Sequence, residues 1–181
     1  DINMSDVNDV LNSAFSDDDD VIFDPSEDEL LPEGSYPAHI IDISSTLVTT
    51  RWGNRADIYK PTYKISNTVE LYGGIELYDD GIWRFRKMKN ETTNPRQSNS
   101  NRQFRNAMKT LEIEVIPVDV NGKKMFKLPE LNRGNTYGKP VMINVYHKTF
   151  KGKYGIRTIA EARLASKWEE GGQLDDFDIP F

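Results

Sequence analysis

One pattern constrains the fold of this chain more than any other. Short β-type runs dominate its middle, and a single helical pattern interrupts them. Before the helical pattern lie three β units, which cover residues 36–43, 57–65 and 75–88. In the third unit Asp80 and Gly81 separate two apolar runs, and such a dipeptide is typical of a tight hairpin turn. The first half of the pattern therefore predicts a β meander of three units.

The helical pattern covers residues 104–111, where apolar side chains recur at positions i, i+3, i+4 and i+7. Two more predicted hairpins follow it, over residues 118–126 and 141–160. Three β units, a helix and further strands is the order of the OB-fold, a five-stranded barrel. The alternative, a β-sandwich, does not require a central helix and has more evenly spaced strands. We therefore expect a mainly β protein with one helix, an OB-fold barrel and an additional hairpin.

The charges are divided between the ends of the chain and its middle. Residues 1–33 hold 12 of the 29 acids and no Lys or Arg, and residues 169–181 hold five acids and no base. The other 12 acids and all 23 bases lie in residues 34–168, which carry an excess of 11 positive charges. A basic domain indicates a polyanionic partner. We predict an acidic N-terminal arm over 1–33, a basic OB-fold domain over 34–167, and an acidic tail over the last 14 residues, 168–181.

The N-terminal arm combines acids with apolar residues. Four aspartates at 17–20 are followed directly by Val21, Ile22 and Phe23. Ahead of them, apolar residues within 4–15 fit one side of a short amphipathic helix. The acidity of the arm favours disorder, and folding on a partner or on the chain's own domain is the alternative.

The chain also ends in an acidic run that is closed by apolar residues. Its last seven residues are Asp175, Asp176, Phe177, Asp178, Ile179, Pro180 and Phe181. A solubilising tail does not explain such an apolar end. The ending resembles the C-terminal tip of bacterial single-stranded DNA-binding proteins, except that Phe177 replaces an acid. The resemblance implies that these seven residues recruit replication or recombination proteins, with Phe181 in an apolar pocket, and that the tip competes with DNA for the basic domain.

The start of the predicted domain carries a second resemblance. Residues 31–38, with Gly53 and Asn54 before the second strand, are similar to the start of phage-encoded OB-fold single-stranded DNA-binding proteins. Together the two resemblances imply a protein that coats and protects single-stranded DNA in phage replication, recombination or repair. Its expected location is the cytoplasm or nucleoid of a bacterial cell. RNA stays open as a second ligand, and so does assembly into a homo-oligomer.

Binding of single strands without sequence preference needs aromatic faces on which bases stack and a basic groove that follows the phosphates. Several segments of this chain interleave aromatic and basic residues. The residues that we predict to bind DNA are Trp52, Arg55, Tyr59, Lys60, Lys64, Arg84, Arg86, Arg102, Arg105, Tyr146, Lys148, Lys151, Lys153, Tyr154 and Arg157.

Strand alternation assigns different roles within the third β unit. It places Trp83 and Phe85 on one face and Arg84 with Arg86 on the other. We expect the aromatic pair in the core and the two arginines toward solvent or phosphate. A stacking role is expected of Trp52, because it lies in a polar turn beside a glycine, with simple partial burial as the alternative.

The residue types exclude several classes of function. Without cysteine there is no disulfide and no thiolate metal site. The two histidines, His39 and His147, lie in no catalytic motif, and we expect His39 to be structural. No apolar run approaches the roughly 20 residues that span a bilayer. We expect no enzyme, no metal, no cofactor and no membrane partner. The remaining alternative is a protein-binding adaptor or modulator of a replication or recombination enzyme, which has no need of a basic middle.

Overall fold

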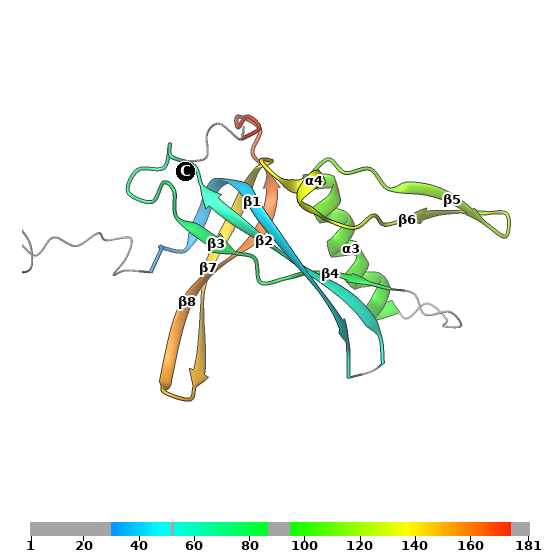
Figure 1. Cartoon of the computed structure of the whole chain (residues 1–181), viewed down its shortest axis with the longest axis horizontal. Coiled ribbons are helices and arrows are strands. Elements are labelled where there is room, and N and C mark those ends of the chain that lie inside the picture. The colour runs from blue at the N-terminus through cyan, green and yellow to red at the C-terminus, as the bar shows by residue number, and fades with distance from the viewer. Residues whose placement is uncertain (1–29, 52, 87–94, 175–181) are drawn as a thin grey trace, which may run out of the picture.

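The computed structural model of the chain describes residues 30–51, 53–86 and 95–174, and the side chains of all of these except 95–100 (Figure 1). Within these ranges it contains eight strands and two helices, so the prediction of a mainly β protein is confirmed. A second, four-residue helix accompanies the single helix that the sequence predicts. No helix in the described ranges is long and apolar enough to cross a membrane.

Six strands form one sheet, and the long strand β1 (Gly34–Thr49) lies at its centre. Its first part pairs with β7 (Pro140–Gly152), and its later part pairs with β2 (Arg55–Ile65). The register of the β1–β2 ladder shifts between Ile40 and Asp42, and such a bulge bends a strand. Strand β8 (Gly155–Lys167) pairs with β7 along its whole length. The two predicted hairpin strands around Gly152 are thereby confirmed.

The predicted hairpin at Asp80 and Gly81 is wrong. Strands β3 (Glu76–Tyr78) and β4 (Ile82–Phe85) do not pair with each other, because both pair with the same edge of β2. Between them the buried carboxylate of Asp79 accepts hydrogen bonds from the Tyr63 hydroxyl at 2.5 Å and from the Gly81 backbone N–H at 2.8 Å. These bonds hold a kink after which the chain continues along β2.

The two ends of the sheet approach each other at one point. Asp79 forms an isolated parallel bridge with Ala162 of β8, and the Asp80 backbone N–H donates to the Ala162 carbonyl at 3.3 Å. The sheet is therefore strongly curved, although the strands described here do not form a closed barrel. The β1–β2 and β7–β8 hairpins extend beyond this curved region as two separate arms (Figure 1).

The core lies between the inner face of the sheet and helix α3 (Pro95–Thr110). Phe104, Met108 and Leu111, which follow the predicted helical spacing, are fully buried there. The ring of Phe104 packs at 5.9 Å from that of Tyr59 on β2. The short helix α4 (Arg133–Thr136) begins at Asn132, whose side chain accepts a hydrogen bond from the Asn135 backbone N–H.

Strands β5 (Ile116–Val120) and β6 (Lys123–Lys127) form a second, separate sheet of two strands. Their turn consists of Asn121 and Gly122, which both have positive φ angles, of 53° and 77°. That conformation is typical of the two-residue hairpin turn that Asn-Gly favours. The predicted additional hairpin is confirmed, and it projects from the body of the molecule (Figure 1).

The described ends of the chain pack against the sheet. Leu31 is part of the core, and the Glu33 carboxylate accepts a hydrogen bond from the His147 backbone N–H at 2.8 Å. At the other end the Leu174 backbone N–H donates to the Gly138 carbonyl at 2.8 Å. The His39 ring contacts the Gly172 carbonyl at 2.8 Å, as expected of a structural histidine. The packed body therefore extends beyond residues 34–167 on both sides.

Candidate nucleic-acid interface

The outer face of β2 forms the floor of the candidate interface. Tyr59 and Tyr63 on this strand are buried in the core. Because successive side chains alternate, Lys60, Thr62 and Lys64 lie on the opposite face. Lys60 is exposed, and Lys64 is half-buried. Two of the predicted DNA-binding lysines are thus four residues apart on one face of one strand.

A cavity of about 380 Å³ lies over the middle of this face, between the β1–β2 hairpin and β8. We call this cavity, with the adjoining outer face of β2, the outer groove. The cavity is lined by Asp42, Ser44, Lys60, Thr62, Tyr78, Asp79, Ile159, Ala160 and Glu161. Tyr78, which pairs with Thr62, is 65% exposed and offers an aromatic face beside Lys60.

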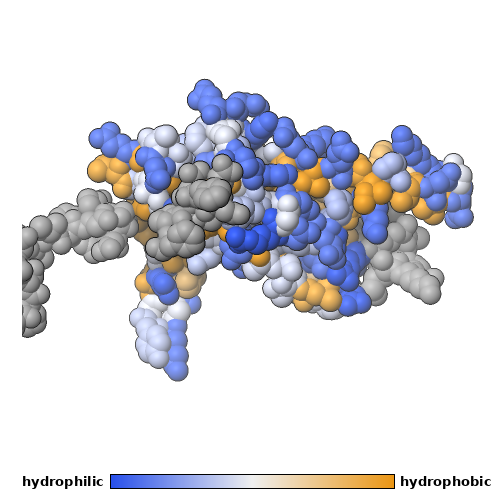
Figure 2. Space-filling model, turned by 45° about the horizontal axis from the view of Figure 1, so that its top comes forward, coloured by the Kyte–Doolittle hydropathy of each residue, from blue (hydrophilic) through white to orange (hydrophobic). Residues whose placement is uncertain are grey.

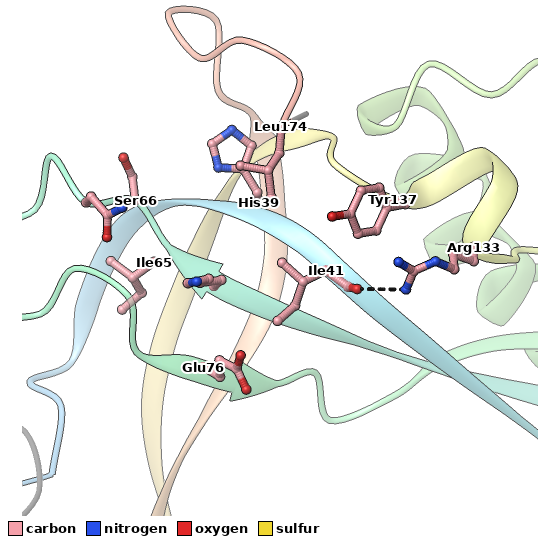
Figure 3. Close-up of a pocket in the computed structure, with 10 residues that line it drawn as sticks. His39, Ile41, Ile65, Ser66, Glu76, Arg133, Tyr137 and Leu174 are labelled. Carbon is pink, nitrogen blue, oxygen red and sulfur yellow. Dashed lines mark hydrogen bonds between the residues drawn. The ribbon is translucent and has the colours of Figure 1, made fainter. Parts of the chain in front are cut away.

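A second cavity, of about 600 Å³, lies at the Lys64 end of the same face, and we call it the end cavity. Figure 3 shows that it is bordered by β1, β2, α4 and Leu174. The Arg133 guanidinium donates to the Ile41 carbonyl at 3.3 Å and lies 4.3 Å from the centre of the Tyr137 ring. The Tyr137 hydroxyl is buried and has no hydrogen-bond partner among the residues that the structure describes. The end cavity thus combines two cations, Lys64 and Arg133, with one acid, Glu76, which pairs with Lys64 across the sheet.

An aromatic pair lies on the outer face of β4. The rings of Trp83 and Phe85 stack with their centres 5.7 Å apart and their planes at 22°. They pair with Ile58 and Ala56, which lie on the same face of β2 as Lys60. The prediction that the two rings belong to the core is wrong, since both are half-buried and neither is in the core cluster. The inner face of β4 instead carries its other two residues.

Arg84 is one of those inner residues, which contradicts the prediction that it faces solvent or phosphate. Its side chain is only 12% exposed and donates to Asp57 at 2.8 Å and to the Leu128 carbonyl at 3.0 Å. Arg86 also donates to Asp57, at 2.8 Å, and its side chain is 42% exposed. The hydrogen bonds from Arg86 and Arg84 lower the pKa of the Asp57 carboxyl. One carboxylate thus binds both arginines within the protein, and Arg84 also lies 3.6 Å from the Glu130 carboxylate.

Tyr59 cannot serve as the predicted stacking platform, because it is 2% exposed and packs between Phe104 and the Arg84 guanidinium. Its strand position has the same parity as that of Tyr63, so the same alternation that exposes Lys60 buries Tyr59. The aromatic surface beside the lysines comes from Tyr78, Trp83 and Phe85 instead.

The β7–β8 hairpin carries most of the remaining predicted residues. Four bases on it are exposed to solvent: Lys148, Lys151, Lys153 and Arg157. Tyr154 at its tip is 95% exposed, and Phe150, which is not among the predicted DNA-binding residues, is 40% exposed. The tip is therefore basic and aromatic, as predicted, and it projects from the body beside the outer groove (Figure 1).

Tyr146 lies lower on the same hairpin and is half-buried. Its hydroxyl donates to Glu161 at 3.0 Å, and burial raises the pKa of that hydroxyl. Arg163 stacks 4.8 Å from the Tyr146 ring and forms an ion pair with Asp80 at 2.9 Å. Arg163, an exposed base that the sequence analysis missed, therefore lies among acids. The only sequence signal for the exposure of Arg163 is its position in a strand whose side chains alternate between two faces.

The other predicted residues are more scattered. Arg55 is exposed at the start of β2, and Arg102 with Arg105 is exposed on α3, outside both cavities. Trp52 and the seven tip residues 175–181 lie outside the described residues. Within the part of the chain that is described, no group of three or more His, Cys, Asp or Glu residues could hold a metal ion.

Comparison with known proteins adds no assignment. No family model matches the chain, and no curated protein matches it.

Proposed function

We propose that this chain is a sequence-tolerant single-stranded DNA-binding protein, not an enzyme, and that the strand lies along the outer groove. In this role it coats and protects single strands during replication, recombination or repair. The observation that carries the proposal is the combination of Lys60 and Lys64 with Tyr78 and the Trp83–Phe85 pair on one face of the sheet. Charged and aromatic side chains in alternation suit a phosphate backbone with bases on one side.

In this proposal each component of the groove has a task in strand binding. Lys60 and Lys64 neutralise phosphates, and the basic tip of the β7–β8 hairpin closes over the strand from the other arm. Exposed rings accept bases by stacking, which tolerates every base because each has a π-face. Acids also line the groove, and one of them, Glu161, already accepts the Tyr146 hydroxyl. These acids, Asp42, Asp79 and Glu161, repel phosphates, so the lysines of the groove and the basic hairpin tip have to outweigh them.

The strand arrangement supports an OB-type fold for the domain. Its β1 is shared between two strand pairs, its helix α3 follows the β3–β4 edge, and β8 returns to that edge at the Asp79–Ala162 bridge. In OB-folds the face of the second and third strands, flanked by the loops between strands 1 and 2 and between strands 4 and 5, binds oligonucleotides. The outer groove corresponds to that face, with the β1–β2 and β7–β8 hairpins as its flanks.

The acidic tip competes with the strand in this proposal. Residue 174 borders the end cavity, so the tip that follows it starts beside Lys64 and Arg133. A short tether gives it an effective concentration in the millimolar range. Its carboxylates suit these two cations and the Tyr137 hydroxyl, which no described residue hydrogen-bonds. A DNA strand that occupies the groove displaces the tip, which then becomes available to replication or recombination proteins.

The proposal is tested with the full chain and four labelled probes of equal length: oligo-dT, a mixed single strand, the matching RNA and duplex DNA. Affinity is measured by fluorescence anisotropy over a range of salt concentrations. We expect similar affinity for the two DNA single strands, weaker duplex binding, and a log-log salt slope of about −0.7 per phosphate contacted. Absence of binding to every probe would favour the adaptor, and a preference for RNA would change the ligand.

A further inference from the structure

The β5–β6 hairpin presents an apolar surface that no described residue covers. All five residues of β5 are exposed, and β6 has one half-buried residue among four exposed ones. Ile116, Val118 and Val120 are 48%, 36% and 45% exposed. Figure 2 shows apolar surface on this projecting part of the molecule. A contiguous patch of this kind indicates an interaction site.

The strand register places the three exposed apolar side chains Ile116, Val118 and Val120 on one side of the hairpin. Ile116, Val118 and Val120 lie on one face of β5, and they pair with Lys127, Met125 and Lys123 of β6. We call this set of six residues the hairpin face. It consists of an apolar stripe with a lysine at each end. The opposite face carries the pairs Asp119–Lys124 and Pro117–Phe126, and there the Lys124 ammonium lies 5.6 Å from the centre of the Phe126 ring.

An isolated two-stranded sheet is marginally stable in water. The hairpin face therefore gains stability when an apolar segment covers it. Its two lysines favour an occupant that also carries acids. Within this chain, residues 17–23 combine four aspartates with Val21, Ile22 and Phe23.

We propose that residues 17–23 of a second copy of this chain dock on the hairpin face. Val21, Ile22 and Phe23 cover the apolar stripe, and the aspartates lie near Lys123 and Lys127. The C-terminal tip has a similar composition, but Leu174 holds its start at the end cavity. The N-terminal arm is therefore the occupant that the charges and the chain path favour.

The length of the connection favours a second copy over the same molecule. Leu31 is fixed on β7, because its carbonyl contacts the His147 ring at 2.7 Å, whereas the hairpin projects from the opposite side of the molecule (Figure 1). Residues 24–30 span at most about 25 Å when fully extended. A domain of this size is roughly 40 Å across. The arm of one copy thus reaches the hairpin of a neighbour more readily than its own.

This contact is heterologous, since the arm of one copy binds the hairpin of the next. Repetition of such a contact gives an open chain of copies. That arrangement suits a protein that coats an extended strand, yet the contact itself involves no DNA. It can be measured independently of the proposed function.

The first test follows self-association of the full chain without DNA by sedimentation velocity, at about 1 to 100 μM protein and low salt. We expect association that grows with concentration and weakens with salt. Val118→Asp and, separately, Ile22→Asp should each weaken it at least about tenfold. The control is Leu71→Asp, because Leu71 is a 72% exposed apolar residue outside the hairpin. Circular dichroism verifies that each variant is folded.

The second test exchanges charges. Lys123→Glu with Lys127→Glu should abolish association, and so should Asp18→Lys with Asp19→Lys. All four changes in one chain should restore it to within about threefold. Lys124→Glu, on the opposite face, is the matched control and should have little effect. The proposal is overturned if the wild type stays monomeric, if Leu71→Asp or Lys124→Glu is equally damaging, if the exchange does not restore association, or if Phe181→Ala and not Ile22→Asp abolishes it.

Discussion

The Nη2 atom of Arg84 lies 2.8 Å from the Oδ2 atom of Asp57, on the inner side of the sheet. Arg86 reaches the other oxygen of the same carboxylate at 2.8 Å. Two arginines that a sequence pattern assigns to phosphate binding are thus both paired with one acid of the protein. Their role is to join β4 to β2 next to the outer groove.

Substitution of Asp57 tests that role. Asp57→Ala leaves the Arg84 guanidinium, with 12% of its side chain exposed, without its carboxylate. We expect the free energy of unfolding in urea to fall by about 3 kcal/mol. Asp42→Ala is the control, since Asp42 is 68% exposed and 4.0 Å from its cation, and should cost less than about 0.5 kcal/mol. Equal losses for the two variants would contradict the assignment.

Asp79 gives the stability a specific pH dependence. Burial raises its pKa to about 6. The folded state therefore holds this proton more tightly than the unfolded state, in which the pKa is about 3.9. The contribution of Asp79 to stability is complete below about pH 4 and decreases by roughly 3 kcal/mol as the pH rises through about 6. We expect the difference in unfolding free energy between wild type and Asp79→Asn to fall between about pH 4 and pH 7. Parallel curves for the two proteins would show that the Asp79 pKa is not raised.

Much of the fold follows from local sequence patterns. The apolar spacing of Phe104, Met108 and Leu111 predicts the helix, and Asn121 with Gly122 predicts the β5–β6 turn. The Asp80–Gly81 dipeptide led to a wrong hairpin prediction, because a kink and a hairpin turn use the same residue types. What distinguishes them is the pairing of both flanking strands with β2, a long-range contact that local composition does not encode.

The site was less predictable than the fold. It depends on which of the two alternating sets of side chains in β2, and in β4, faces the core. In β2 the set that contains Tyr59 and Tyr63 also contains Arg55 and Asp57, and in β4 each set contains apolar residues, so composition does not indicate which set is inside. The structure buries Tyr59 and Arg84 and brings Trp83 and Phe85 to the outer face. Lys60 is exposed, since a lysine in an otherwise buried strand favours the outer side.

Trp83 lies outside and Tyr59 is buried, the reverse of the roles that the sequence predicts. Substitutions of these two residues should therefore affect DNA binding differently. Trp83→Ala should weaken binding of oligo-dT by about tenfold, since stacking on one ring is worth about 1–3 kcal/mol per base. Trp83→Phe should retain most of the affinity, because it keeps an aromatic face. Tyr59→Phe should leave affinity unchanged within about twofold, because the ring is in the core. Anisotropy titrations measure the affinity of all three variants. Equal affinity of Trp83→Ala and wild type would show that the Trp83–Phe85 pair does not bind the strand.

Removal of residues 175–181 tests the competition between tip and strand. Because these residues carry three acids and start at the end cavity, their deletion should tighten oligo-dT binding several-fold at low salt. The difference should vanish near 1 M salt, where charges are screened within about 3 Å. A variant with Asp175, Asp176 and Asp178 changed to Asn separates the charge effect from that of length. Unchanged affinity in both variants would exclude the competition.

The most direct measurement compares oligo-dT affinity and its salt dependence for wild type, Lys60→Glu with Lys64→Glu, and Lys124→Glu. The double variant removes both lysines of the outer groove, whereas Lys124 lies on the separate β5–β6 sheet. We predict that the double variant binds at least about 100-fold more weakly and has a salt slope that is smaller by about 1.4, which corresponds to two lost phosphate contacts. Lys124→Glu should stay within about twofold of the wild type. Wild-type affinity and slope in the folded double variant would contradict the assignment of the outer groove as the strand-binding surface.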